Sequence, residues 1–339
     1  MGSVVSSCLP PNSRFGGKLN DYSRECIERE YGCHMDALLK EAVEKCYPYT
    51  QKGALASYIP ELTKADKDAL GICLTFSDGT CFCAGNDDTQ FTIQSIIKPI
   101  LLLLALIDNG EEYVRSRVGL EATGKAFDAI NASDQKLDSE HINPMVNMGA
   151  IAMCALIHGN TYAEKFQRLL ALTRKLADNP KIELNESVYL SEKRTGNKNR
   201  ALAYLLKAHG FFPDEVEDVL DFYFKACSIQ VTCRDLASIA RVLANHGKKA
   251  QTEEQIIPSQ FAYYINAVLV TCGMYNGSGN FAVDVGIPAK SGVGGGIMAV
   301  APQRMGIGIF SPALDSKGNS LAGIQLLRYL SQKMHLSVF

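Results

Sequence analysis

Residues 96–107 constrain the fold of this chain more than any other segment, because they are apolar throughout except for Lys98. The run is too short for a transmembrane helix, which needs about 20 apolar residues. Its length and composition predict a helix buried in a protein core. The chain has 339 residues, of which 47% are hydrophobic and 21% charged, as in an ordinary globular protein. Such a helix carries Lys98 into the core.

Ser95 stands one helical turn before this lysine. Residues at positions i and i+3 share one face of a helix, so Ser95 and Lys98 are expected to point the same way. A buried lysine resists protonation because desolvation disfavours its charge, and a neutral amine beside a hydroxyl is a general base beside a nucleophile. The arrangement resembles the Ser-x-x-Lys motif of penicillin-binding proteins and serine β-lactamases. The motif also arises by chance, with a solvated lysine, so other segments must converge on it.

Strand patterns occur near both ends of the chain and helical patterns fill its centre. Residues 70–76 and 81–85 read as strands around a hairpin turn centred on Asp78 and Gly79. Further strands are predicted at 91–94, 281–283, 296–300 and 305–310, and helices at 21–47, 150–157, 162–176, 199–207, 213–227, 234–245, 259–272 and 320–332. This order predicts an α+β fold, in which an antiparallel sheet from both chain ends is flanked by helices and an all-helical subdomain is inserted.

The same order suggests how the chain is divided. We expect a flexible tail over residues 1–20 and a single domain over residues 21–335. One lobe would combine residues 21–100 with residues 275–335, and residues 101–274 would form a helical lobe. The Ser95 helix would then lie where the lobes meet, which is a preferred place for a small-molecule site.

A glycine-rich segment, Lys290-Ser291 followed by residues 292–296, is the second candidate site segment. Four glycines in five positions are costly in regular structure and suit a close approach of backbone to a ligand. The N–H groups of Val293 and Ser95 would together bind an oxyanion. A phosphate-binding loop is the alternative, but this segment leads into a strand and not into a helix. Lys-Ser-Gly also resembles the Lys-Thr-Gly signal of the serine β-lactamases.

Two polar segments and three tyrosines complete the candidates. Asn147 either caps a helix or binds substrate. Residues 191–200 read as a polar loop, in which Glu192 would bind an ammonium and Asn199 a carboxylate or amide; a solvated loop is the alternative. Three tyrosines in separate segments either relay a proton or pack on a surface. They are Tyr58, Tyr223 and Tyr275.

Charge and cysteine content narrow the class of protein. The net charge is −2, from 34 basic and 36 acidic residues, and no basic stripe is visible, which argues against nucleic acid as a partner. The eleven cysteines include no Cys-x-x-Cys pair, and no secretory segment precedes them. We therefore expect reduced, mostly buried thiols in a cytoplasmic protein, with metal binding or a redox role as the alternative. Cys81 and Cys83 fall on one face of a predicted strand.

The first residues fit a lipidation pattern. Gly2 and Ser6 match the N-myristoylation motif, and Cys8 is placed for a second acyl chain. One chain gives marginal membrane binding and two give stable attachment. A disordered leader is the alternative, so peripheral membrane association is expected only if Gly2 and Cys8 are both acylated.

Taken together, these segments resemble the serine-dependent glutaminases, the L-glutamine amidohydrolases with a β-lactamase-like, transpeptidase-like fold. The resemblance covers roughly residues 30–330. Its segments come in the family's order, at residues 58–62, 91–98, 143–151, 191–200 and 290–296. Met148 and Ile97 stand where the family tends to have smaller or more polar residues, and neither removes a catalytic group.

The resemblance implies a mechanism and a set of roles. Ser95 would be the nucleophile and Lys98 its base, Tyr58 and Tyr275 would lie at the scissile amide, and the N–H groups of Ser95 and Val293 would form the oxyanion hole. Substrate glutamine would be bound by Asn147, Glu192, Asn199, Tyr223, Tyr275 and Val293. Lys290 corresponds to the strand lysine, whose role is the least defined. A glutamyl ester would form and be hydrolysed without metal or organic cofactor, in a homodimer or homotetramer.

Two rival interpretations remain open at the level of sequence. A penicillin-binding protein or β-lactamase should have a Ser-x-Asn or Tyr-x-Asn element, and the candidate Tyr264-Ile265-Asn266 lies in a helical stretch close to Lys290. A catalytically silent scaffold tethered through Gly2 and Cys8 is the non-enzymatic alternative. The retention of Ser95 and Lys98 argues against it.

Overall fold

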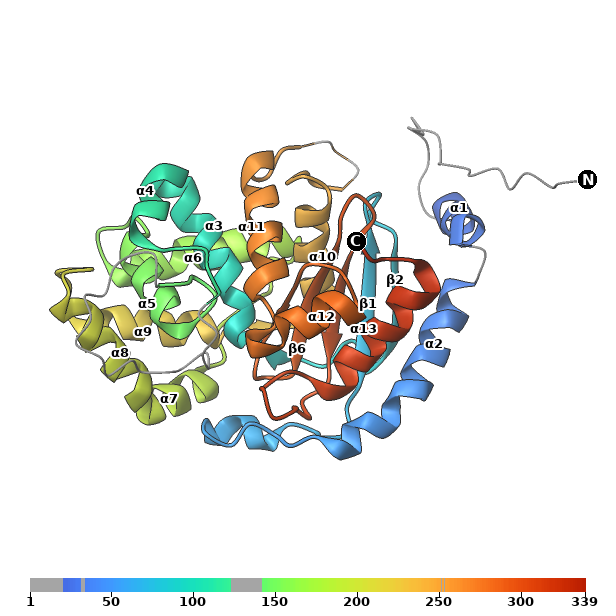
Figure 1. Ribbon diagram of the computed structural model, residues 1–339, viewed down its shortest axis with the longest axis horizontal. Helices are drawn as coiled ribbons and strands as arrows, with labels where there is room; N and C mark the ends of the chain where they lie inside the picture. The colour runs from blue at the N-terminus through green and yellow to red at the C-terminus, as the bar shows by residue number, and fades with distance from the viewer. Residues whose placement is uncertain (1–20, 32–33, 123–141, 251, 253) are drawn as a thin grey trace, which may run out of the picture.

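The computed structural model describes residues 21–31, 34–250, 252 and 254–339, apart from residues 123–141 (Figure 1). The predicted tail, with Gly2 and Cys8, lies outside these residues. Among the helices described, none is both long and apolar enough to cross a membrane.

A five-stranded antiparallel sheet forms one side of the molecule, and its strands come from both ends of the chain (Figure 1). Strands β1 (Gly71–Phe76) and β2 (Cys81–Gly85) belong to the N-terminal part. The C-terminal part supplies β5 (Ala289–Ser291), β6 (Gly296–Ala301) and β7 (Met305–Phe310). The order β2-β1-β7-β6-β5 places β1 against β7. The predicted α+β fold with a sheet from both chain ends is therefore confirmed.

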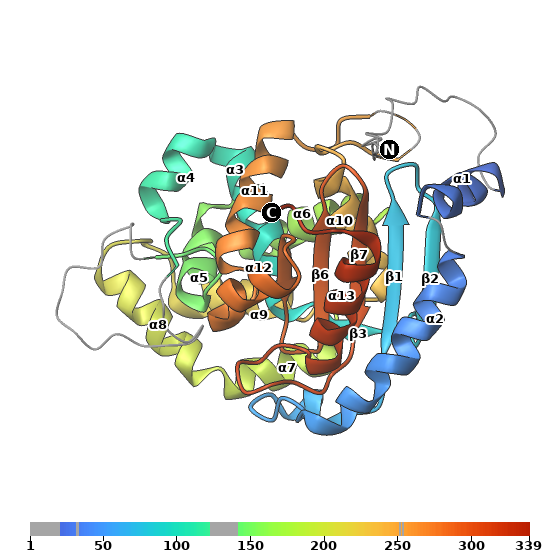
Figure 2. The same cartoon turned by 45° about the vertical axis from the view of Figure 1, so that its right-hand side comes forward.

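Helices cover both faces of this sheet. On one face α2 (Met35–Cys46) and α13 (Leu321–Met334) pack on alternate strand residues such as Leu74 and Ile307. Figure 2 shows α13 in front of the sheet and α2 along its β2 edge. On the other face α10 (Cys233–Ala244) approaches β7 so closely that a Cβ at Gly308 would lie 2.0 Å from the Cys233 carbonyl oxygen. Only glycine allows this contact, because a side chain has no room there.

Most of the remaining helices gather beside the sheet, to the left in Figure 1. The apolar run forms α3 (Lys98–Asn109), whose side chains from Ile100 to Leu106 are all buried, as the sequence predicts. The other helices of this group are α4 (Glu111–Arg117), α5 (Asn147–Leu156), α6 (Tyr162–Ala177), α7 (Glu186–Thr195), α8 (Asn197–Ala208), α9 (Val216–Cys227) and α11 (Ser259–Cys272). Helix α12 (Ser278–Asp284) follows α11 and packs Phe281 into the core on the α2 and α13 face of the sheet. Helix α1 (Asp21–Tyr31) precedes α2, and a short ladder pairs β3 (Phe91–Thr92) with β4 (Gln230–Val231).

Two secondary-structure predictions were wrong. Residues 281–283 form part of helix α12 and not a strand; Phe281 packs inward while Val283 is 88% exposed. Residues 191–200 are not a loop but the end of α7, Gly196, and the start of α8. Charged and amide side chains cover the exposed sides of these two helices, so their helical periodicity is weak in the sequence.

The expectation of reduced thiols was wrong at one pair, because Cys73 and Cys83 form a disulfide. The reason lies in the hairpin turn. A two-residue turn at Asp78-Gly79 would place Ala84 opposite Cys73. The observed loop has one more residue, because Phe76 N–H donates to Thr80 O at 2.9 Å and Gly79 is left-handed. The additional residue shifts the partner of Cys73 from Ala84 to Cys83. A shift of one residue also turns every side chain of a strand to the opposite face, so the two cysteines point to the same side.

Candidate active site

Ser95 lies on a 3-10 turn, Gln94–Ile97, between strand β3 and helix α3. Ile93 N–H still pairs with Ile229 O at 2.8 Å, as an extension of the β3–β4 ladder. Gln94 then adopts a left-handed conformation with φ 48°, which ends the strand sharply. The sequence predicted a strand through Gln94 and a helix from Ser95, so the chain bends earlier than expected. The bend leaves Ser95 at the head of α3.

The hydroxyl of Ser95 and the amine of Lys98 are in contact. Lys98 Nζ donates to Ser95 Oγ at 2.8 Å. Lys98 has no exposed side-chain surface, and Ser95 is 7% exposed. The sequence placed these two groups on one face, and the structure shows them within hydrogen-bonding distance.

Asn147 connects this pair to three other helices. Its Oδ1 accepts from Lys98 Nζ at 2.8 Å and from the Tyr223 hydroxyl at 3.3 Å, and its Nδ2 donates to Asn199 Oδ1 at 2.9 Å. Helix α5 takes Val146 as its N-cap, and no side chain caps it. The capping interpretation of Asn147 was therefore wrong, and its amide instead joins α5 to α3, α8 and α9.

Glu192 is the acidic group of the site. It projects from α7 and is 5% exposed. Burial raises its pKa to about 8, although a hydrogen bond from Gln94 and the charge of Lys98 act in the opposite direction. Its Oε2 is buried and has no hydrogen-bond partner among the described residues. A donor brought by a ligand would satisfy this oxygen.

A cluster of charges fixes the helix that carries Glu192. Asp221 on α9 accepts hydrogen bonds from Lys193 and Tyr189 on α7, and forms an ion pair with Lys225. Burial alone would raise the pKa of Asp221, but these bonds outweigh it and lower the pKa to about 2. The carboxylate therefore stays charged and holds α7 against α9, which carries Tyr223.

Tyr275 and Lys290 lie on the other side of Ser95. Lys290 is fully buried and donates to the carbonyl oxygens of Gly273 and Ser291, at 3.1 and 2.8 Å. Its Nζ lies 4.4 Å from the centre of the Tyr275 ring. Burial, followed by the nearby charge of Lys98, holds the pKa of Lys290 well below its usual value. Burial also raises the pKa of Tyr275, although a hydrogen bond with Ser95 acts against the increase. The phenol is thus kept neutral beside the Ser95 hydroxyl.

The glycine-rich loop lies against the strand that leads to Ser95. A Cβ at Gly292 would approach Ile93 O to 2.9 Å, and one at Gly294 would approach Thr92 O to 2.8 Å. Val293, between them, is 4% exposed. Neither the Ser95 nor the Val293 N–H finds an acceptor among the residues that the structure describes. Buried N–H groups are normally paired, so these two are available to an anion.

A cavity of about 270 Å³ opens over Ser95. Tyr58, which is 54% exposed, stands at its rim and also lines a neighbouring cavity beside Tyr275 and Val293. The other polar side chains that line the cavity over Ser95 are Gln94, Ser95, Asn147, Glu192, Thr195, Asn197, Lys198, Asn199 and Tyr223. Eight of the ten residues predicted from the sequence thus line the first or the second cavity. Lys98 contacts Ser95, and Lys290 lies against the ring of Tyr275.

Gln94 and Cys227 also line the first cavity and were not predicted. Gln94 directly precedes the nucleophile, but its left-handed backbone and its bond to Glu192 leave no sequence signal. The described residues contain one group of three potential metal ligands, Cys73, Cys81 and Cys83, which lies in the β1–β2 hairpin and not in this cavity. The cavity therefore combines a hydroxyl in contact with a buried amine and two backbone N–H groups without an acceptor among the described residues, a set suited to acyl transfer.

Comparisons with known proteins identify relatives along most of the chain. The profile of the family described as Glutaminase matches residues 53–339. The chain is 53% identical to a Clostridium tetani protein named Glutaminase over 305 residues, which are 90% of this chain and all of that protein. It is 51% identical, with the same coverage of both chains, to Glutaminase 2 of Clostridium perfringens.

Solved structures agree with these matches. A probable glutaminase from Bacillus subtilis, in complex with 6-diazo-5-oxo-L-norleucine, is 39% identical, with a TM-score of 0.83 over 90% of this chain and 96% of that one. A second structure shows a Bacillus subtilis glutaminase in covalent complex with 5-oxo-L-norleucine, at 39% identity and a TM-score of 0.82, covering 90% and 99% of the two chains.

Proposed function

The chain belongs to the glutaminase family and hydrolyses L-glutamine to L-glutamate and ammonia, and we propose that the reaction passes through a glutamyl ester on Ser95. The observation that carries the proposal is the 2.8 Å contact between Ser95 Oγ and the fully buried Lys98 Nζ. The covalent complex of the Bacillus subtilis relative with 5-oxo-L-norleucine supports a covalent mechanism.

In the first half-reaction, Lys98 first gives up the extra proton of its charged form to solvent, and the neutral amine then takes the Ser95 proton while Oγ attacks the side-chain amide carbon. Full burial disfavours a charged amine, and its lone pair can accept from Ser95 while an N–H donates to Asn147. The carbonyl oxygen gains negative charge and accepts from the Ser95 and Val293 N–H groups. Tyr275 passes the proton from Lys98 to the leaving nitrogen, and ammonia departs.

In the second half-reaction, water attacks the ester carbon. Lys98 accepts the proton of the water and returns it to Ser95 Oγ as the ester bond breaks. Glutamate is released and the serine is restored, so each turnover consumes one water molecule. Lys290 positions Tyr275 by lying over its ring, and does not itself reach Ser95 through any bond described here.

Glutamine would be recognised through the two charged groups on its α-carbon. Glu192 offers its unpartnered oxygen to the α-ammonium. Asn199 faces the α-carboxylate with its N–H donors, and the Tyr223 hydroxyl would turn from Asn147 to donate to the same group. Asn147 holds Lys98 and Asn199 in place through hydrogen bonds, so it would connect the base to the carboxylate-binding side chain. Tyr58, exposed at the rim, would cover the bound side chain.

The test is ammonia release from L-glutamine by the purified chain. We expect Ser95→Ala and Lys98→Ala each to lose essentially all turnover, because nucleophile and base act as one unit. Ser116→Ala, at an exposed serine on α4, should match wild type. L-Asparagine measures the selectivity for side-chain length.

A second readout separates a missing nucleophile from a damaged fold. Intact mass after treatment with 6-diazo-5-oxo-L-norleucine should show an adduct on wild type and Lys290→Met but none on folded Ser95→Ala. Ammonia release by Ser95→Ala close to the wild-type rate would refute the assignment.

Assembly follows from the family resemblance, and location from the cysteine content and the N-terminal motif. We propose a homodimer or homotetramer, to be measured by light scattering against the chain mass of 36.9 kDa. We also propose a cytoplasmic enzyme that attaches to membranes only when Gly2 and Cys8 are both acylated. Incorporation of a myristate analogue by wild type, and not by Gly2→Ala, in a eukaryotic lysate would support attachment, and no incorporation would exclude it.

A further inference from the structure

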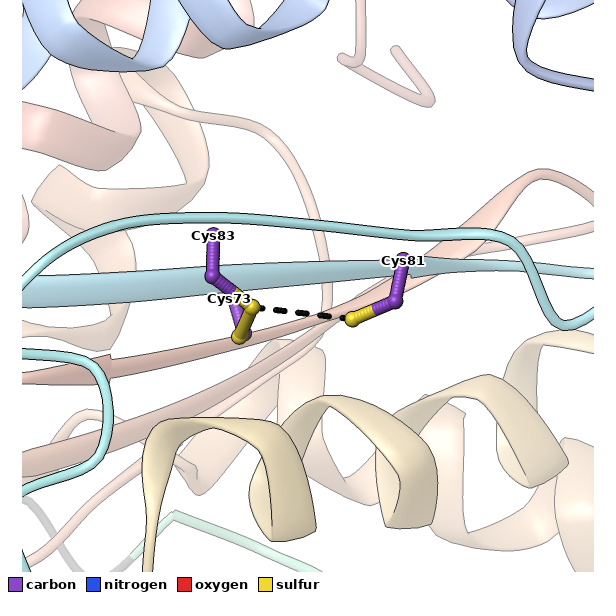
Figure 3. Close-up of side chains that lie close together, drawn as sticks. All are labelled: Cys73, Cys81 and Cys83. Carbon is purple, nitrogen blue, oxygen red and sulfur yellow. Dashed lines mark hydrogen bonds between the residues drawn. A yellow bond between two sulfur atoms is a disulfide. The ribbon is translucent and has the colours of Figure 1, made fainter. Parts of the chain in front are cut away.

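Three cysteines meet on the β1–β2 hairpin, outside the active site (Figure 3). Cys73 on β1 stands opposite Cys83 on β2, and the two form a disulfide. Cys81, two residues earlier on β2, points to the same side, with its Sγ 3.6 Å from Cys83 Sγ. The three sulfur atoms all lie within 4.8 Å of one another.

Oxygen donors and positive charge surround this cluster. Asp87 Oδ2 lies 3.8 Å from Cys73 Sγ, and Thr75 Oγ1 lies 3.7 Å from Cys81 Sγ. Arg24 donates to the Cys81 carbonyl oxygen at 3.1 Å, with its guanidinium 4.0 Å above the Phe82 ring. Cys73 is buried, while Cys81 and Cys83 are half-buried, so the cluster remains accessible from the sheet edge.

We propose that Cys73, Cys81 and Cys83, once the disulfide is reduced, bind one Zn²⁺ ion through three thiolates, with Asp87 or water as the fourth ligand. Zn–S bonds of about 2.3 Å in a tetrahedral site place the sulfur atoms about 3.8 Å apart. The Cys81–Cys83 separation of 3.6 Å already matches this spacing. Three soft sulfur ligands favour zinc over hard cations such as Ca²⁺.

Zinc binding requires prior reduction of the Cys73–Cys83 disulfide, for which a dithiol is the reductant. The dithiol gives two electrons and two protons to the Cys73–Cys83 bond and becomes a disulfide, leaving three thiols in the hairpin. Zn²⁺ then displaces their three protons. The guanidinium of Arg24 offsets part of the negative charge of the resulting site. In either redox state a covalent or metal link would join the edge strand β2 to β1.

The test uses the full chain, reduced with a phosphine, freed of metal, and titrated with Zn²⁺ against a chromophoric chelator. We expect one ion per chain, and with Co²⁺ a thiolate-to-metal charge-transfer band. Cys81→Ser removes a ligand without breaking the disulfide, and should weaken Zn²⁺ binding by at least about 100-fold. Cys26→Ser, at a half-buried free cysteine on α1, is the matched control and should bind like wild type.

Three results would overturn the proposal. In the first, reduced wild type holds Zn²⁺ no more tightly than Cys81→Ser. In the second, the untreated, disulfide-bonded chain binds as tightly as the reduced chain. In the third, the phosphine fails to release the Cys73 and Cys83 thiols from the folded protein. Circular dichroism of each variant identifies losses that come from unfolding, and a Cys73→Ser variant then repeats the ligand test.

Discussion

At the scale of single residues, the role proposed for Glu192 would link substrate binding to pH. Burial raises its pKa to about 8, so below that pH the free enzyme carries a neutral acid where the α-ammonium of glutamine needs a carboxylate. Binding at lower pH must therefore first remove the proton. The same burial that sharpens recognition makes it dependent on pH.

We expect kcat/KM for glutamine to rise between pH 6 and about 8, because the fraction of ionised Glu192 rises across this window. Glu192→Gln should have a much lower kcat/KM and should lose this rise. Steady-state kinetics at several pH values measure both. A wild-type profile that is flat over the window would contradict the assigned role of Glu192.

Glu192 should also lower the stability of the enzyme that it serves. Its folded pKa lies above its usual value of 4.5, so the folded state holds the proton more tightly than the unfolded state. The cost is absent below about pH 4.5, grows as pH rises, and levels off above about pH 8 at about 5 kcal/mol. Glu192→Gln should therefore unfold at higher urea concentration than wild type at pH 8, and the gap should narrow at pH 5. An equal gap at both pH values would be inconsistent with this account.

At the scale of elements, the contact of α10 with β7 leaves no space for a side chain. Gly308→Ala would place a Cβ 2.0 Å from the Cys233 carbonyl oxygen, so we expect it to lower the free energy of unfolding by about 3 kcal/mol or more. Gly279→Ala on α12 is the control: nothing lies within 4 Å of its added Cβ, and alanine favours a helix by about 0.5–1 kcal/mol. Urea unfolding of both variants gives the comparison. Equal stabilities would mean that α10 can move away from the sheet at little cost.

Elements with one strongly buried face could be predicted from the sequence, and others could not. Helix α3 is apolar all round and was predicted, and so was most of α8, whereas α7 exposes a polar surface and its last residues were interpreted as part of a loop. The hairpin was predicted, but its register was not, because one additional loop residue is invisible to the alternation pattern. The Cys73–Cys83 pair was missed because the register was not known and because reduced thiols were expected throughout.

At the scale of the whole molecule, the last helix covers strands from both ends of the chain. Leu330 on α13 is fully buried in the cluster that contains Ile72 and Ile297. The sheet from both chain ends was predictable, because its central strands are short, wholly apolar runs bounded by turn residues. The convergence of the site residues was implied by family resemblance and not by any pattern of residues. The hydrogen bonds of Asn147 depend on the packing of four helices that are distant in sequence.

We expect Leu330→Ala to lower the free energy of unfolding by about 2–5 kcal/mol, because it opens a cavity in this shared core. Activity and secondary structure should disappear together on heating, since β5, which leads to Val293, belongs to the same sheet. Gln332→Ala, at an exposed position of the same helix, should stay within about 0.5 kcal/mol of wild type. Loss of activity well below the melting of secondary structure would show that the site is less coupled to α13 than we infer.

The left-handed residue before the nucleophile limits how this site can change over evolution. Position 94 must satisfy two demands at once: a backbone with φ 48°, which β-branched residues and proline resist, and an amide side chain that reaches Glu192. Glycine meets the first demand without the second, and glutamate meets neither the charge nor the donor requirement. A substitution at position 94 must therefore satisfy both the backbone and the side-chain requirement, so few single substitutions there could adapt the site to a new substrate.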